Sequence, residues 1–156
     1  MLRLRRISIA VALLAALMVG TTSLATAGGE KVLDASMAGI SQANQNLYGV
    51  QGGGLPWTLD FGSARLFADG RLQVTVKGLV IASGPNTGRN TVPTGRAIVT
   101  CAGAPVAMSS IVPFSVPDGD ARINETIALP ADCAGPAVFF TGITGAGPRW
   151  FAVTGW

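Results

Sequence analysis

Residues 57–81 read WTLDFGSARLFADGRLQVTVKGLVI and predict two consecutive β-strands joined by a tight turn. Within 72–77 (LQVTVK), apolar and polar residues alternate, which is the period of a strand with one buried face. Asp69-Gly70 lies between the two runs, and a glycine accepts the positive φ that a short hairpin turn requires. This stretch therefore predicts an antiparallel hairpin.

The first run of the hairpin also places its apolar residues at every second position. Trp57, Leu59 and Phe61 alternate with Thr58 and Asp60. Since successive side chains of a strand point to opposite faces, we expect the three apolar side chains on the buried face and the two polar ones in solvent.

The same kind of pattern continues to the C-terminus, with segments rich in Gly, Pro, Asn and Asp between short apolar runs. Further strands are expected at 79–81, 96–101, 105–112, 121–129, 137–143 and 149–154. Seven or eight short strands, with turns about every 8–12 residues, predict an all-β domain over 55–156. We expect a single antiparallel β-sandwich, roughly immunoglobulin-like, whose strand order the sequence leaves open.

The segment that precedes this domain has only weak periodicity. Residues 28–54 are mostly small and polar, and they end in Gly52-Gly53-Gly54. We expect a loose N-terminal arm here, with a short helix at 32–38 as the alternative.

The extreme N-terminus has the three parts of a secretory signal. Arg3, Arg5 and Arg6 precede an apolar run from Ile7 to Val19, and a polar stretch ends in the small-x-small sequence Ala25-Thr26-Ala27. An apolar run of this length is shorter than the roughly 20 residues that span a bilayer. We therefore expect a signal peptide at 1–27 that is cleaved off, rather than a membrane anchor. The protein is expected to be secreted, extracellular or associated with the cell envelope.

The basic net charge of +3 comes from this signal segment. The chain has 11 basic and 8 acidic residues, and three of the basic ones lie in 1–27, which leaves eight of each sign in the exported part. Nucleic-acid binding needs a basic surface, and binding to anionic lipid needs a polybasic patch. We expect neither a nucleic-acid partner nor a membrane span in the exported part.

Cys101 and Cys133 are the only cysteines, and both fall in the exported part. Such a pair outside the cytoplasm is usually a disulfide. Free buried thiols and a metal pair are the alternatives, but two cysteines without histidine make a poor metal site. We expect a Cys101–Cys133 disulfide, and no metal or cofactor.

The residue inventory excludes the familiar nucleophilic enzymes. The chain has no histidine, so Ser-His-Asp and Cys-His catalysis are absent, and no serine lies in a G-x-S-x-G sequence. No glycine-rich phosphate loop is present. A small hydrolase with two carboxylates flanking a cleft is the weakest remaining hypothesis, and we expect no enzymatic activity. The carboxylates of the exported part are Glu30, Asp34, Asp60, Asp69, Asp118, Asp120, Glu125 and Asp132.

Glu125 is the carboxylate whose position in the pattern is unusual. It is in phase with Ile123 and Ile127, so simple alternation points it inward. A buried carboxylate needs a partner, and Arg96 and Arg122 are the candidate cations. A bulge that turns Glu125 outward is the alternative.

The aromatic residues are the remaining functional candidates. Trp150 and Trp156 are in phase with each other, so they point outward if Phe151 on the opposite face points into the core. With Trp57 and Tyr48 they could form a contact surface. The alternative is that Trp57 and Trp150 fill the core or cap its ends.

Several short segments resemble those of a known group of sequences: Gly53–Trp57, Asp69–Leu72, Gly78–Val80, Gly119–Ile123, Leu129-Pro130 with Cys133 and Pro136, and Arg149–Ala152. On these residues the chain resembles a group of small exported proteins of unknown function from high-GC bacteria. The resemblance covers roughly 50–156 and consists mainly of turn and core residues. It implies a signal peptide and a compact β domain, and it brings no activity, cofactor or catalytic residue.

Three functions follow from these observations, in order of preference. The first is a non-catalytic exported β-sandwich that acts by contact with another protein or the cell envelope. The second is a carbohydrate-binding module that uses exposed Trp residues, and the third is the hydrolase with paired carboxylates. An exposed coplanar Trp pair favours the second, two carboxylates in one cleft favour the third, and a surface with neither favours the first.

Overall fold

The computed structural model describes residues 29–155, which form strands and no helix. The expected signal peptide and Trp156 lie outside these residues. The strands are β1 (Lys31–Gly39), β2 (Asn46–Leu47), β3 (Val50–Gln51), β4 (Trp57–Thr58), β5 (Phe61–Phe67), β6 (Arg71–Lys77), β7 (Val80–Ile81), β8 (Thr94–Cys101), β9 (Ala104–Met108), β10 (Val112–Pro113), β11 (Ala121–Thr126), β12 (Ala137–Thr144) and β13 (Gly147–Thr154).

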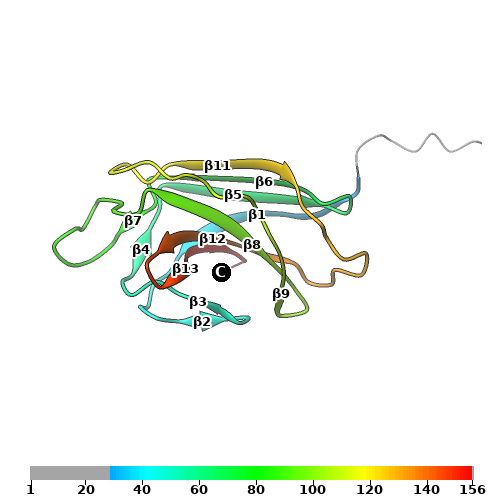
Figure 1. The fold of residues 1–156 in the computed structure, drawn as a ribbon, viewed down its shortest axis with the longest axis horizontal. Helices are drawn as coiled ribbons and strands as arrows, with labels where there is room; N and C mark the ends of the chain where they lie inside the picture. Colours follow the sequence, from blue (N-terminus) through cyan, green and yellow to red (C-terminus); the bar gives the residue numbers. More distant parts are fainter. Residues whose placement is uncertain (1–28, 156) are drawn as a thin grey trace, which may run out of the picture.

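Most of these strands belong to one antiparallel sheet that folds over on itself. Its order is β10-β8-β12-β13-β1-β5-β6-β11, and β9 pairs with β8. Figure 1 shows two facing layers, with β1, β5, β6 and β11 in one and β8, β12 and β13 in the other. The two short pairs β2–β3 and β4–β7 lie outside the main sheet. The expected all-β, sandwich-like architecture is confirmed.

The first long strand carries the sheet from one layer to the other. Lys31–Ser36 of β1 pair with β5, and Met37–Gly39 pair with β13. The order within the layers is not that of an immunoglobulin constant domain, where the second strand lies beside the fifth. Here β5 pairs with the next strand, β6. Strand order was the part of the fold that the sequence left open.

The hairpin expected at 57–81 is present as β5 and β6. In β6, Leu72, Val74 and Val76 are almost completely buried, and the residues between them are partly exposed. Gly70 follows the turn with φ of 85°. Its carbonyl oxygen accepts a hydrogen bond from Ile127 N at 2.9 Å, and a Cβ at this position would overlap the carbonyl of Ile127. The alternation and the turn residue therefore predicted this element correctly.

The expected face of the first run is wrong at one position. Trp57 is 6% exposed and Leu59 is half-buried, but Phe61 is 52% exposed. The chain leaves β4 after Thr58 and starts β5 at Phe61, so the alternation of the two strands is not continuous. Both expected polar positions, Thr58 and Asp60, are exposed.

The prediction of a loose arm or a short helix at 28–54 is also wrong. Residues 31–39 form β1, a nine-residue strand near the middle of the sheet. Gly39 is required there by close packing, because a Cβ on this residue would overlap the backbone carbonyl of Trp57. The ordered segment 40–54 then crosses the outside of β13, where Gly53 N donates to Trp150 O at 3.0 Å.

The two cysteines form the expected disulfide. Cys101 ends β8 and Cys133 lies in the loop before β12, with their Cα atoms 5.0 Å apart. The backbone N–H of Ala102 also donates to Ala134 O at 2.7 Å. The bond therefore fastens a loop whose residues are mostly exposed to the end of β8.

Candidate functional site

The tryptophans do not form the expected contact surface. Trp57 is 6% exposed and Trp150 is 1% exposed, while Trp156 lies outside the described residues. A flat platform for sugar stacking therefore does not exist at Trp57 or Trp150, and the prediction of an exposed Trp surface is corrected for both.

Trp150 is buried although it points away from the space between the layers. The face of β13 that was expected to meet solvent is covered by residues 40–54, and Trp150 Nε1 donates to Gln45 O at 3.0 Å. Its ring packs edge to face on Phe139, with centroids 5.7 Å apart. The covering segment thus converts an expected surface residue into a core residue.

Trp57 is covered by Phe151 on one face of its ring. The two rings stack with centroids 3.9 Å apart and 10° between the planes, and the Phe114 ring lies 6.4 Å from both of them. Residues 29–155 contain no acceptor for Trp57 Nε1, and the only fully buried unpaired side-chain atom among them is Arg96 Nε. The indole N–H of Trp57 therefore keeps contact with solvent.

Trp57 also lines a pocket of about 520 Å³, together with Ile81 of β7. Proteins bind small molecules in concave sites of about 300–1,000 Å³. The lining residues are Asn44, Gln51, Gly53, Gly54, Leu55, Trp57, Ile81, Thr91, Val92, Thr144, Arg149 and Phe151. They include one arginine and no carboxylate. We call this the Trp57 pocket.

A second pocket, of about 570 Å³, gathers three carboxylates: Asp60, Asp118 and Asp120. It meets the criterion of two carboxylates in one cleft that would favour a hydrolase. All three carboxylates are exposed, however, and Asp120 Oδ1 accepts a hydrogen bond from Gly78 N at 2.9 Å. A general acid is usually held protonated by burial, and nothing here desolvates these groups.

Residues 29–155 contain no group of three or more His, Cys, Asp or Glu side chains that could hold a metal ion. In the same part of the chain, no helix is long and apolar enough to cross a membrane.

Glu125 is half-buried, and its partner is a backbone amide rather than an arginine. Its Oε1 accepts a hydrogen bond from Ser110 N at 2.7 Å. The β6–β11 register has no irregularity there, so no bulge turns the side chain outward. Glu125 links β11 to the segment that follows β9, which is a structural role.

That segment belongs to an unusual part of the surface. Residues 101–117 contain no charged side chain, and exposed large apolar side chains are concentrated there: Val106 at 38%, Met108 at 56%, Ile111 at 51% and Val116 at 52%. Within the described residues, β9 pairs only with β8, so its other edge is free. A free, uncharged edge strand is a template for pairing with another chain.

Two neighbours extend this surface beyond β9. Tyr48, 49% exposed at the tip of the β2–β3 hairpin, lies beside Gly103 of the β8–β9 turn. Arg96 on β8 donates through Nη1 to Met108 Sδ at 3.6 Å, and its Nε is buried without an acceptor. We use "β9 surface" for Tyr48, Arg96, Val106 and Met108.

The protein is all-β and disulfide-bonded, with a sandwich-like architecture, and it carries the Trp57 pocket and the β9 surface. No family model, no curated protein and no solved structure matches the chain.

Sequence reasoning missed most of both sites. Arg149 and Asn44 lie about 100 positions apart in the chain, and neither belongs to a motif. The only available signal was the absence of charge between Cys101 and Asp118, which could have indicated the β9 surface.

Proposed function

We propose that the chain is an exported, non-catalytic protein that acts by contact with another protein or with the cell envelope, and that the β9 surface makes this contact. The observation that carries the proposal is the free edge of β9, with exposed Met108 and Val106 in a stretch that has no charge. Monomeric proteins usually protect such edges with charged residues. Here the interruptions are Pro105 and a register irregularity between Val99 and Thr100 in the pairing of β8 with β9.

Export is part of the proposal. The signal pattern of residues 1–27 and the disulfide support it, because structural disulfides are typical of proteins outside the cytoplasm. The resemblance to small exported proteins of high-GC bacteria stays a prediction. A sugar platform of tryptophans is not proposed, because Trp57 and Trp150 are buried.

Arg96 adds a chemical preference to the contact. No ion pair formed by residues 29–155 includes it, although it is partly buried and its Nη1 contacts Met108 Sδ. A buried cation is stabilised by a carboxylate that reaches it in a complex. A partner with an apolar strand and an acidic side chain fits this surface best.

The test is a co-sedimentation experiment. The full chain is expressed in an export-competent bacterium, and the exported protein is incubated with envelope fractions of the organism that encodes it. Met108→Lys places a charge on β9, and Phe61→Lys does the same at a similarly exposed apolar residue on β5. We expect Met108→Lys to weaken saturable binding about tenfold or more, because burying a methionine contributes about 1.5–3 kcal/mol.

Phe61→Lys is the matched control and should leave binding within about twofold, since surface changes away from a contact have small effects. Absence of saturable binding to any envelope fraction, or equal loss in both variants, would reject the β9 surface as the site of contact.

A further inference from the structure

The Trp57 pocket is separate from the β9 surface and does not depend on the contact proposed there. Trp57 and Ile81, on β4 and β7, line it at one end of the molecule, and β9 lies toward the other end (Figure 1). From its donors, its charge and its apolar walls, we propose that this pocket binds a small organic anion that carries an apolar body.

The walls of the pocket are fixed before any ligand arrives. Gln51 Nε2 donates to Asn44 O at 2.8 Å, and Asn44 N donates to Gly53 O at 2.7 Å. Trp57 N donates to Ile40 O at 2.8 Å, so the strand that carries the indole is also held. A preformed site binds more tightly because its groups are already ordered.

Gly53 is what allows the chain to pass so close to the aromatic stack. A Cβ at this position would lie 2.9 Å from Phe151 Cε1 and 3.3 Å from Trp57 Nε1. The backbone at Gly53 therefore lies close to both the Phe151 ring and the indole nitrogen of Trp57.

The polar groups of the pocket are mainly donors without partners. Trp57 Nε1 keeps contact with solvent, as described above. Arg149 is half-buried and takes part in none of the ion pairs formed within residues 29–155. The side-chain amide of Asn44 and the hydroxyl of Thr91 line the same space.

The charge of the lining is what selects an anion. Arg149 is its one ionisable residue, whereas the pocket at Asp60 contains three carboxylates. A guanidinium binds carboxylate and phosphate oxygens with short, charge-assisted hydrogen bonds. A cationic ligand would meet only repulsion in the Trp57 pocket.

The apolar part of the lining selects the body of the ligand. Leu55, Ile81, Val92 and Phe151 contribute side chains to the walls, and Leu55 remains 40% exposed at the mouth. An inorganic anion would leave these walls in water. A ligand that buries an alkyl or aromatic group against them gains the corresponding apolar burial.

The test compares probes that separate these features. The full chain is exported and purified, and it is titrated by calorimetry with octanoate, octyl phosphate, octanol and acetate. Binding is also followed through the indole N–H resonance of Trp57, assigned by its proximity to the Phe151 ring. Arg149→Gln removes the cation, and Arg89→Gln is the control, because Arg89 is an exposed arginine of the carboxylate-lined pocket.

We expect octanoate or octyl phosphate to bind saturably and to shift the Trp57 indole resonance, with the stronger of the two identifying the preferred anionic group. Octanol and acetate should bind at least about tenfold more weakly, since octanol lacks the anionic group and acetate lacks the apolar body. Arg149→Gln should weaken binding of the anion about tenfold, and Arg89→Gln should leave it unchanged.

Three results would overturn the proposal. They are the absence of saturable binding of either anion up to about 10 mM, equal binding of octanol and octanoate, and an Arg149→Gln variant that binds as tightly as the unmodified chain. The comparison of octanol with octanoate uses the unmodified protein, so it decides the question even if Arg149→Gln does not fold.

Discussion

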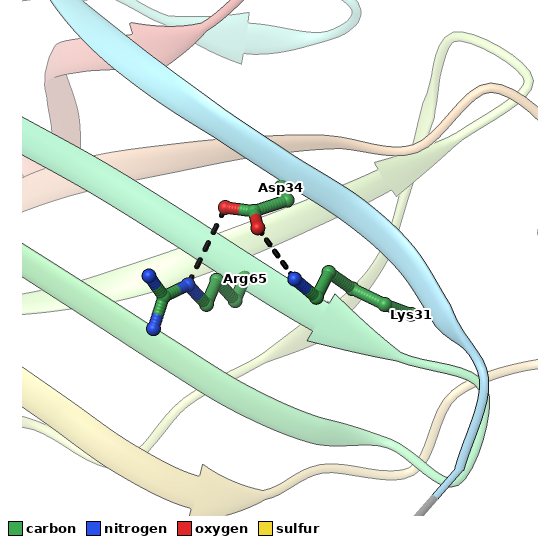
Figure 2. A network of polar contacts seen from close by, with 3 residues as sticks. All are labelled: Lys31, Asp34 and Arg65. Carbon is green, nitrogen blue, oxygen red and sulfur yellow. Dashed lines mark hydrogen bonds and ion pairs between the residues drawn. The ribbon is translucent and has the colours of Figure 1, made fainter.

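The carboxylate of Asp34 on β1 is held by two cations, one from its own strand and one from the neighbouring strand β5. Lys31 Nζ lies 2.6 Å from Asp34 Oδ2, and Arg65 Nε lies 3.4 Å from Oδ1. Figure 2 shows the two cations beside the carboxylate. The hydrogen bond from Lys31 is the main cause that lowers the pKa of Asp34 below its ordinary value of 3.8, and Arg65 contributes less. A lowered folded-state pKa stabilises the fold above pH 3.8, and this contribution is lost as the pH falls through the folded pKa.

We therefore predict that Lys31→Met raises the pKa of Asp34 toward 3.8, and that Arg65→Gln raises it by a smaller amount. The measurement is an NMR titration of the side-chain carboxyl carbons. Asp69 is the internal control, because its pKa is lowered chiefly by a hydrogen bond from Arg71 and should not respond to Lys31→Met. An Asp34 that titrates at 3.8 or above in the unmodified chain would contradict the prediction.

At the residue scale, the sequence correctly predicted whether a side chain is exposed only where segments close in the chain determine its exposure. Thr58 and Asp60 are exposed as expected. Trp150 was expected outside because alternation implies one solvent-facing side of β13. The segment that buries it contacts it from Gln45, 105 positions away, and no local pattern encodes such a contact.

At the scale of elements, the β5–β6 hairpin was predictable and β1 was not. The hairpin pairs residues that are close in the chain, and its turn residue is the one that the geometry requires. In β1, Met37 is the only buried residue, and the two strands that pair with β1, β5 and β13, belong to different layers. Its small residues fit that crossing but give no clear period of two.

The disulfide acts on one element, the loop between β11 and β12. Within 127–136 most residues are exposed, and Cys133 is packed against the core. Closing a loop of 32 positions stabilises the folded state by about 3–4 kcal/mol in the chain-entropy model. We predict that Cys101→Ser/Cys133→Ser lowers the free energy of unfolding by about this amount, measured by urea denaturation.

Reduction of the unmodified protein is the control for the serine substitutions. It should reproduce most of the loss, because Cys101 is buried and the serine there adds only the smaller cost of a buried hydroxyl. A double variant that differs from the oxidised protein by less than about 1 kcal/mol would show that the loop is held by other contacts.

At the scale of the whole molecule, the two proposed sites share no residue, although Tyr48 and Gln51 belong to the same β2–β3 hairpin. Trp57 and Ile81 at the pocket belong to β4 and β7, which lie on the left in Figure 1, whereas β9 lies farther to the right. Substitutions at distant sites without shared partners have nearly additive effects. Met108→Lys should therefore leave octanoate binding unchanged, and Arg149→Gln should leave envelope binding unchanged.

The proposed export determines which net charge and redox state we expect for the whole molecule. If residues 1–27 are removed, eight basic and eight acidic residues remain, so the released protein has no net charge and the basic character of the full chain disappears with the signal. The disulfide then forms outside the reducing cytoplasm.

We predict an intact mass that begins at Gly28, with no cysteine alkylated before reduction and both alkylated after it. The chain is expressed at full length and both the medium and the envelope fraction are analysed by mass spectrometry. A full-length mass in the membrane fraction would instead indicate an uncleaved anchor, and alkylation of both cysteines in the unreduced, denatured protein would show that the bond does not form in the cell.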